Sequence, residues 1–184
     1  GKDQRRRAAE ESRRRVMQGE IRATVVGAGM IGAQMDGPGA PVPLTHAGGY
    51  VANGFLLVAL VDSDPSVRSQ GTRWGCQVFA DFDEMMRAAK PQVLSFAVPA
   101  EQQPALLRRS LAYRPLAVIA EKPLARSSAE AEAIVRAFRE QGIPLIVNYT
   151  RRFVPAWQQM RGGSAMSTTI RYAKGLRHNG THAI

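Results

Sequence analysis

Cysteine, lysine and long apolar runs are scarce in this sequence of 184 residues, and these shortages exclude whole classes of protein. The one cysteine, Cys76, permits no internal disulfide, and we expect it to be a small buried apolar side chain in a reducing cytoplasm. The longest uninterrupted apolar run, residues 55–61, is far shorter than the roughly 18 residues that predict a membrane-spanning helix. Residues 1–15 are charged and no apolar segment follows them, so they do not resemble a secretory signal. We therefore expect a cytoplasmic protein without a membrane span.

Lysine is scarce although positive charge is not, because only four of the 25 basic residues are lysines while the formal net charge is +10. Such an excess raises nucleic acid as a partner. Part of the charge lies in residues 1–20, which we interpret as a basic arm, either helical or disordered. No zinc finger, aromatic RNA-binding motif or basic zipper accompanies the arm, so a solvated arm is favoured over a nucleic-acid interface.

The apolar pattern predicts an α/β protein, because strand-like runs alternate with amphipathic stretches as in a Rossmann-type doubly wound parallel sheet. The expected strands cover residues 21–26, 55–61, 92–98, 116–120 and 143–147. Near Tyr149 the pattern changes to a further helix and a polar strand. We therefore expect a nucleotide-binding domain over residues 21–148, followed by the start of an incomplete α/β second domain over residues 149–184.

Capping boxes predict where two helices begin. The spacing of an Asp or Ser three residues before a Glu occurs at Asp81 with Glu84 and at Ser127 with Glu130. In the second helix Ile134, Val135 and Phe138 share one face, which predicts packing on the sheet. Gly142 predicts the end of that helix.

A glycine cluster follows the first expected strand, since Gly27, Gly29 and Gly32 have the G-x-G-x-x-G spacing of a dinucleotide-binding loop. In that motif the first glycine permits a tight turn, the second lets a pyrophosphate approach the backbone, and the third allows helix and strand to pack. The phosphate would lie on free N–H groups at a helix N-terminus. A plain turn is the alternative. Residues 37–43, rich in glycine and proline, predict a loop insertion. The segment around Thr45 and His46 could overlie the cofactor, but we interpret His46 as an ordinary loop histidine.

Asp62 ends the second expected strand, where a carboxylate can accept both hydrogen bonds of an adenosine ribose and repel a 2′-phosphate. This position favours NAD over NADP as the cofactor. The spacing from Gly32 exceeds the usual ~20 residues, and the insertion accounts for the excess. Two alternatives stay open: a turn-forming role for Asp62, and NADP as the cofactor because Arg68 follows nearby.

Directly after the fourth expected strand, Glu121, Lys122 and Pro123 resemble the E-K-P motif of the Gfo/Idh/MocA oxidoreductase family. The glycine cluster, the acidic strand end and the segments 148–153 and 175–182 occur in the family's order, so the resemblance extends over about residues 21–184. It implies a nicotinamide-binding Rossmann domain, followed by a second domain whose open antiparallel sheet faces the substrate. The substrate it implies is a sugar, an inositol or a related polyol.

The resemblance also implies the chemistry, which is hydride transfer between nicotinamide and a carbon that bears a hydroxyl. Such a reaction needs a base for the hydroxyl proton and a cation for the developing alkoxide. By resemblance His182 is the base and Lys122 the cation. The cofactor contacts that the resemblance implies are at Gly27, Gly29, Met30, Ile31, Gly32, Asp62, Val98, Pro99, Glu121 and Lys122.

Three departures from the family pattern bear on these expectations. His178 stands where the family usually has an Asp, residues 98–100 replace a common Thr-Pro-Asn, and Gln103 replaces a common His. The pair His178 and His182 leaves zinc binding and a frayed chain end as alternatives, although we expect no metal. Because most of the second domain is missing from the sequence, a non-catalytic dinucleotide-binding or protein-interaction module is the alternative to an oxidoreductase. The oligomeric state is left open.

Overall fold

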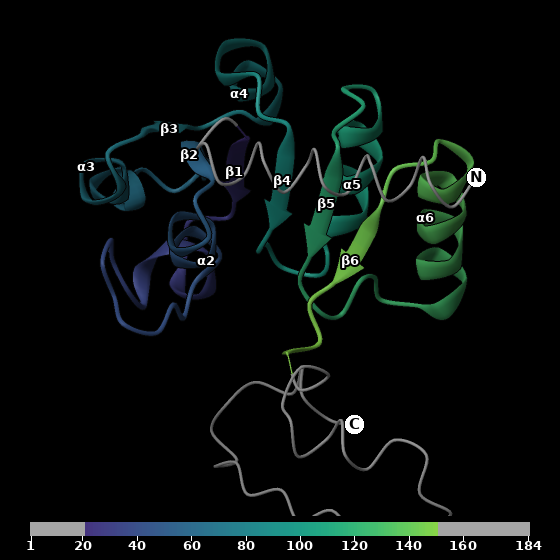
Figure 1. Ribbon diagram of the computed structural model, residues 1–184. Helices are drawn as coiled ribbons and strands as arrows, with labels where there is room; N and C mark the ends of the chain where they lie inside the picture. The colour runs from purple at the N-terminus through teal and green to yellow at the C-terminus, as the bar shows by residue number, and fades with distance from the viewer. Residues whose placement is uncertain (1–20, 151–184) are drawn as a thin grey trace, which may run out of the picture. The chain divides into compact units, whose positions relative to one another are not determined.

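The computed structural model describes residues 21–150, and these are built on a six-stranded parallel sheet (Figure 1). The strands are β1 (Arg22–Val26), β2 (Leu56–Val61), β3 (Gln77–Phe79), β4 (Val93–Phe96), β5 (Ala117–Ala120) and β6 (Leu145–Val147). The five expected strands are confirmed, although each is shorter than expected, and β3 is a sixth strand. The chain divides into two units, residues 1–149 and 150–184. The basic arm and the expected elements beyond residue 150 lie outside the described residues.

The strand order β3-β2-β1-β4-β5-β6 is that of a doubly wound sheet. From β1 the chain moves outward to β3 and then returns to the other side of β1 to begin β4. Every pairing is parallel, so the carboxyl ends of the strands lie along one edge, the lower edge in Figure 1. Sheets of this kind bind ligands at that edge, where the order reverses between β1 and β4.

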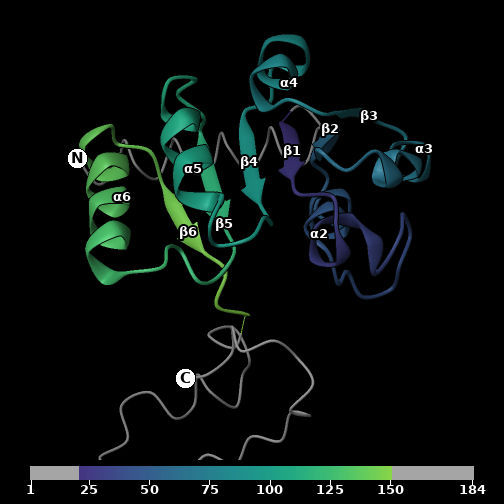
Figure 2. The same cartoon turned by 180° about the vertical axis from the view of Figure 1, so that it is seen from behind.

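Helices cover both faces of the sheet. They are α2 (His46–Ala52), α3 (Ser69–Trp74), α4 (Phe82–Ala89), α5 (Gln103–Leu111) and α6 (Ser128–Glu140), with a π-helix η1 (Met30–Gln34) and a 3-10 helix η2 (Pro65–Arg68). One apolar cluster places α2 and α3 on one face, and a second places α4, α5 and α6 on the other, the face that Figure 2 turns toward the viewer. No helix among residues 21–150 has the length and apolar character needed to cross a bilayer.

Alternation along β1 divides the core between these two faces. Ala23 and Val25 belong to the cluster with Tyr50 of α2 and Trp74 of α3, whereas Val26 belongs to the cluster on the other face. All four residues Ala23–Val26 are buried, as expected for a central strand that is covered on both sides.

Both predicted helix starts are confirmed, since the Glu84 amide donates to the N-cap Asp81 Oδ1 over 2.8 Å and the Glu130 amide donates to the N-cap Ser127 Oγ over 3.2 Å. Gly142 follows α6 with a positive φ of 68°, which closes the helix as predicted. One expectation about α6 is wrong. Ile134 and Phe138 are buried, but Val135 is 38% exposed because it lies at the margin of the buried face.

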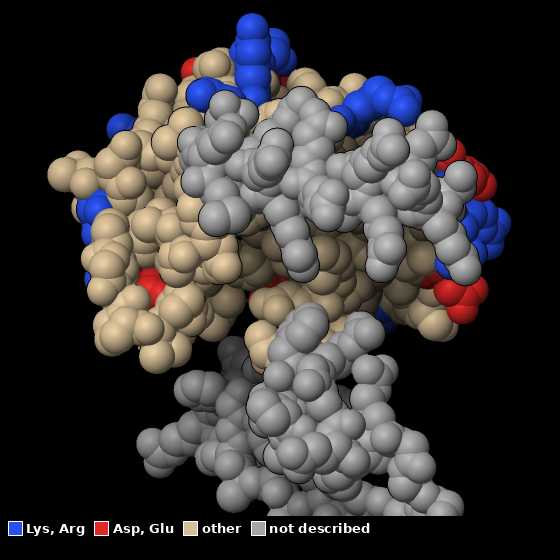
Figure 3. Space-filling model, in the orientation of Figure 1, with Lys and Arg blue, Asp and Glu red and all other residues tan. Residues whose placement is uncertain are grey.

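Charged side chains distinguish the two edges of the sheet. On the face drawn in Figure 3, the described Lys and Arg side chains gather along the upper rim, over α4, and at the sides. The lower rim, where the strands end, is occupied mainly by other residue types on this face. Positive charge therefore does not mark the carboxyl edge in this view.

The expected insertion is confirmed as a loop between η1 and α2, and a buried carboxylate holds it together. Asp36 accepts hydrogen bonds from the Leu44 amide, from the Thr45 amide over 3.0 Å and from the Thr45 hydroxyl. The same Thr45 hydroxyl accepts from the Gly48 amide over 2.9 Å and so caps α2. Gly48 has to be glycine, because a Cβ there would lie 2.4 Å from Asp36 Oδ2.

Burial alone would raise the pKa of Asp36, but its hydrogen bonds from Thr45 and Leu44 and the nearby charge of Arg73 hold that pKa below its ordinary value of 3.8. A carboxyl group whose pKa is lower in the folded state stabilises the fold above its ordinary pKa. This contribution is lost as the pH falls through the folded-state pKa.

We expect Asp36→Asn to lower the free energy of unfolding by roughly 2 kcal/mol, because the amide NH₂ leaves a buried donor of Thr45 without an acceptor. Urea unfolding at pH 7 measures this loss. Thermal unfolding between pH 6 and pH 3 should also depend less on pH in the variant than in the wild type. Glu132→Gln, the same change at an exposed carboxylate, is the control, and equal stability of the two variants would contradict the role given to Asp36.

Candidate functional site

The carboxyl edge of the sheet brings together most of the positions that the sequence singles out. Each position follows the end of a strand or lies in the loop or short helix after it: Gly27, Gly29, Met30, Ile31 and Gly32 after β1, Asp62 after β2, Val98 and Pro99 after β4, and Glu121 and Lys122 after β5. His182 lies outside the described residues. The candidate site is therefore this edge, from β2 to β5.

Gly27 and Gly32 are glycines because the chain itself leaves no room for a side chain. Gly27 has a φ of 91°, donates from its amide to the Val61 carbonyl over 2.8 Å, and a Cβ there would lie 2.4 Å from the Ala97 carbonyl oxygen. A Cβ on Gly32 would lie 1.8 Å from the Gly27 carbonyl oxygen. These two glycines thus make the tight turn and the close packing that the motif requires.

Gly29 differs from its two neighbours in the motif, because no protein atom lies within 4 Å of where its Cβ would be. Its φ of −72° and ψ of −161° are accessible to any residue. Neither packing nor backbone conformation therefore requires glycine here. In the G-x-G-x-x-G motif, the second glycine is the one whose bare backbone a pyrophosphate approaches.

The helix after the glycine loop is short. It is the five-residue π-helix η1, which ends where the insertion begins. Two side chains of α3 donate to its last carbonyls: the indole N–H of Trp74 to the Ala33 carbonyl over 2.8 Å, and Arg73 to the Gln34 carbonyl over 3.1 Å. Met30 and Ile31 at its start are 61% and 44% exposed, so their side chains are available to a ligand at this edge.

Asp62 is fixed beside the glycine loop by two backbone donors. Its Oδ2 accepts from the Ala28 amide over 2.9 Å, and its Oδ1 accepts from the Asp64 amide over 3.0 Å. The first of these bonds joins residues 34 positions apart, across the insertion. The carboxylate therefore stands at the strand end in the place that the sequence predicts, next to the loop that would hold a dinucleotide.

The loop after β4 forms the other wall of the glycine turn. The Val98 side chain lies 3.0 Å from where a Gly27 Cβ would be. The Pro99 carbonyl accepts from the amides of Gln102 and Gln103 over 3.0 and 3.1 Å, which starts α5. Val98 and Pro99 therefore lie near the β1/β4 switch point.

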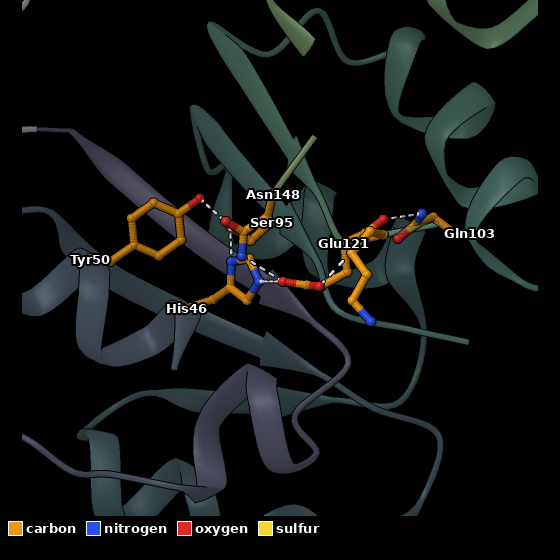
Figure 4. Close-up of polar contacts among 7 residues, drawn as sticks. His46, Tyr50, Ser95, Gln103, Glu121 and Asn148 are labelled. Atoms are coloured by element: carbon orange, nitrogen blue, oxygen red, sulfur yellow. Dashed lines mark hydrogen bonds and ion pairs between the residues drawn. The ribbon is translucent and has the colours of Figure 1, made fainter. Parts of the chain in front are cut away.

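A buried chain of hydrogen bonds ends on the Glu121 carboxylate (Figure 4). His46 Nε2 and Asn148 Nδ2 contact Glu121 Oε1 over 3.1 and 2.6 Å. On the other side of the ring, His46 Nδ1 contacts the Ser95 hydroxyl over 3.1 Å, and that hydroxyl contacts the Tyr50 hydroxyl over 2.7 Å. Residues from α2, β4 and the end of β6 thus converge on the residue that follows β5.

Electrostatics keep the Glu121 carboxylate charged and the Tyr50 hydroxyl neutral. Burial alone would raise the pKa of Glu121, but the hydrogen bonds from His46 and Asn148 lower it below the ordinary value of 4.5. Burial raises the pKa of Tyr50 to about 12 against the opposing hydrogen bond with Ser95. The chain therefore has a protonated hydroxyl at one end and an ionised carboxylate at the other at neutral pH.

The interpretation of His46 as an ordinary loop histidine is wrong. It is the first residue of α2, its side chain is only 7% exposed, and both ring nitrogens have partners. Sequence reasoning missed Tyr50 and Ser95, and it noted Asn148 only within segment 148–153, without a role in the site. One signal could have found Ser95, because it is the polar residue inside the otherwise apolar strand β4 and is fully buried.

Gln103 holds the backbone of the same loop from its other side. Its Nε2 donates to the carbonyls of Glu121, Pro123 and Leu124 over 2.7, 2.9 and 3.2 Å. Its side chain is buried, and its Oε1 has no hydrogen-bond partner among the described residues. Lys122 is half-buried and lies between Glu121 and Pro123, whose carbonyls both accept from Gln103. The Lys122–Pro123 peptide bond is cis.

Cys76 and the possible metal ligands are the remaining candidates from the sequence. Cys76 is partly buried against the α2 and α3 cluster, and burial raises the pKa of its thiol to about 11, so it is a poor nucleophile. Among residues 21–150 no group of three or more His, Cys, Asp or Glu side chains is arranged to hold a metal ion. The pair His178 and His182 lies outside that range.

Comparisons with known proteins agree with this geometry. Residues 21–149 match the model of the Gfo/Idh/MocA family, described as an oxidoreductase family with an NAD-binding Rossmann fold. The chain is 32% identical over 108 residues to D-apiose dehydrogenase of Paraburkholderia graminis, an alignment that covers 58% of this chain and 28% of the relative.

Two solved structures share the fold. GenD2 from gentamicin A biosynthesis, in complex with NAD, is 26% identical with a TM-score of 0.60, over 69% of this chain and 34% of that one. Scyllo-inositol dehydrogenase of Lactobacillus casei, with bound NAD(H) and scyllo-inositol, is 19% identical with a TM-score of 0.62, over 76% and 39%. The chain thus spans about a third of the length of the relatives it matches.

The glycines of the loop should differ sharply in their tolerance of alanine. We expect Gly32→Ala to lower the free energy of unfolding by about 3 kcal/mol or more, because its methyl group would overlap the Gly27 carbonyl. Gly29→Ala should leave stability within about 0.5 kcal/mol of the wild type, because nothing lies near its Cβ. Chemical denaturation of the two variants measures both values, and a large loss in Gly29→Ala would show that packing explains this glycine.

Proposed function

This chain belongs to the Gfo/Idh/MocA oxidoreductase family, and we propose that it binds NAD at the carboxyl edge of its sheet for hydride transfer to or from a sugar- or inositol-like alcohol. The observation that carries the proposal is Gly29, which neither packing nor backbone conformation requires to be glycine. It stands in a motif whose second glycine admits a pyrophosphate. The fixed carboxylate of Asp62 beside the same loop supports a dinucleotide over a simpler phosphate compound.

The residues at this edge fit a dinucleotide. Backbone amides at the start of η1 would receive the pyrophosphate, with Met30 and Ile31 against it. The Asp62 carboxylate would accept from the two hydroxyls of the adenosine ribose. Its negative charge would repel the 2′-phosphate of NADP, so we propose NAD as the preferred cofactor.

Two side chains would serve the chemistry. When bound, the nicotinamide supplies the hydride acceptor or donor. The Lys122 ammonium would stabilise the charge that develops on the substrate oxygen, and a lysine in the loop after β5 stands at the edge where doubly wound sheets bind ligands. His182, outside the described residues, would take the hydroxyl proton.

The names of the relatives support a substrate class. D-apiose and scyllo-inositol are both polyhydroxylated, and their dehydrogenases match this chain in sequence or in fold. We therefore propose a polyhydroxylated alcohol or the corresponding ketone as substrate. A dinucleotide-binding module without turnover is the second candidate, and the last experiment of this subsection separates the two.

Binding of NADH tests the first half of the proposal. We expect saturable enhancement of nicotinamide fluorescence with the wild type and no saturation with Gly29→Trp, whose indole would occupy the space above the loop backbone. Gly49→Ala, at another glycine with open space around it, is the matched control and should bind as the wild type does. Equal binding by Gly29→Trp would remove the glycine loop as the site.

Competition between NADH and NADPH in the same titration measures cofactor preference. We expect tighter binding of NADH, and a preference reduced roughly tenfold in Asp62→Asn because the repulsive charge is lost. Asp64→Asn changes the exposed carboxylate two residues further along and should keep the wild-type preference. An unchanged preference in Asp62→Asn would contradict the role of Asp62.

Turnover tests the second half of the proposal. With NAD and a panel of polyols we expect an increase in absorbance at 340 nm, and a loss of at least a hundredfold in kcat for Lys122→Met, because the cation at the reacting oxygen is removed. Lys90→Met, which removes an exposed lysine after α4, is the control. NADH binding without turnover on any substrate would favour the non-catalytic module.

A further inference from the structure

The loop 121–124 is held in place by more side chains than its own strand supplies. Gln103 fixes three of its backbone carbonyls, and Asn148 and His46 contact the carboxylate of its first residue. Gln103 and Asn148 come from segments that lie next to β5 in the fold, at the start of α5 and the end of β6. His46 does not, because it begins α2 in the first half of the sheet, so its contact with Glu121 crosses the β1/β4 switch point.

Hydrogen-bond chemistry gives this chain a direction. An ionised carboxylate only accepts, so the proton of the contact between His46 and Glu121 lies on His46 Nε2. When the imidazole is neutral, Nδ1 is an acceptor and can take the hydroxyl proton of Ser95. Ser95 Oγ in turn accepts from the Tyr50 hydroxyl. With a neutral ring, every donor in the chain of contacts drawn in Figure 4 faces toward Glu121.

We propose that His46 is a positioning residue: it holds the Glu121 carboxylate across the switch point, and through Glu121 it sets the place and orientation of Lys122. Ser95 and Tyr50 fix the ring of His46 in turn. This inference rests on the proposed function, in which the Lys122 ammonium acts at the reacting oxygen. With this role, a residue from the first half of the sheet would help to place a catalytic residue of the second half.

The burial of the chain supports a positioning role over a purely structural one. Tyr50 and Ser95 are 5% and 0% exposed, and His46 lies beside them at the apolar cluster of α2. Apolar side chains of similar size would fill the same space without the desolvation that polar groups require. A fully satisfied polar chain does, however, fix one geometry, and an error of about 1 Å in the position of a reacting group can reduce a rate roughly a hundredfold.

The scarcity of lysine offers a direct readout of Lys122. Reductive methylation with ¹³C-formaldehyde labels the amino groups, and the chain has only Lys2, Lys90, Lys122 and Lys174 besides its N-terminus. Comparison with Lys122→Arg assigns the dimethyl-lysine signal of Lys122 in a ¹H–¹³C spectrum of the full chain. The exposed Lys90 is an internal reference. The spectrum is recorded without cofactor or substrate.

We expect His46→Leu to move the Lys122 signal toward the position and linewidth of the Lys90 signal, because the side chain then samples several orientations. His46→Gln should restore the wild-type signal, since an amide can donate to Glu121 and accept from Ser95. Tyr50→Phe and Ser95→Ala, which each remove one hydroxyl, should move it less and in the same direction. Tyr113→Phe removes a hydroxyl that bonds Asp83 on α4 over 3.0 Å, and should leave it unchanged.

The outcomes separate this inference from the proposed function. A wild-type Lys122 signal in folded His46→Leu would overturn the positioning role, even if the chain oxidises polyols. If His46→Leu does not fold, wild-type signals in both Tyr50→Phe and Ser95→Ala overturn it instead. A moved signal in a chain without turnover would support the positioning of Lys122 and count against the proposed reaction only. Where turnover is present, His46→Leu should lower kcat at least tenfold with little change in the KM for NAD.

Discussion

The pairing of β1 with β2 on one side and with β4 on the other is the constraint on which the site depends. It leaves so little space at the carboxyl end of β1 that the chain must turn between the Val61 and Ala97 carbonyls, and only glycine at position 27 permits this. The same closeness places the Ala28 amide within 2.9 Å of Asp62. The turn and the carboxylate are therefore set by backbone packing alone. A ligand would meet them already in place.

Much of the fold could be predicted because it repeats simple local rules. Strands that are covered on both faces are continuous apolar runs, and helix starts have side-chain acceptors, so both are visible in the sequence. The strand ends were less predictable, since burial extends beyond hydrogen-bonded pairing. Ile143, for example, is 7% exposed and belongs to the core, yet β6 begins only at Leu145.

The parts of the site that the sequence did not predict depend on contacts between distant residues. His46 and Glu121 are 75 residues apart, and Asn148 is a further 27 along the chain. No local pattern encodes such a meeting, because it follows only from the order of the strands. The helix after the glycine loop, by contrast, ends at Gln34, before the glycine- and proline-rich insertion that the sequence marks as a loop.

The pKa of both Asp36 and Glu121 lies below its ordinary value. Their hydrogen-bond donors, however, come from different distances along the chain. Asp36 takes its donors from within ten residues, at Leu44 and Thr45, so it stabilises only its own loop. Glu121 accepts from the adjacent Lys122 amide, but its side-chain donors come from two remote segments, which it joins. Thr45 and His46 are adjacent in the sequence. Thr45 donates hydrogen bonds to Asp36, and His46 donates one to Glu121. This pair of neighbours therefore links the insertion to the loop that carries Lys122 by hydrogen bonds.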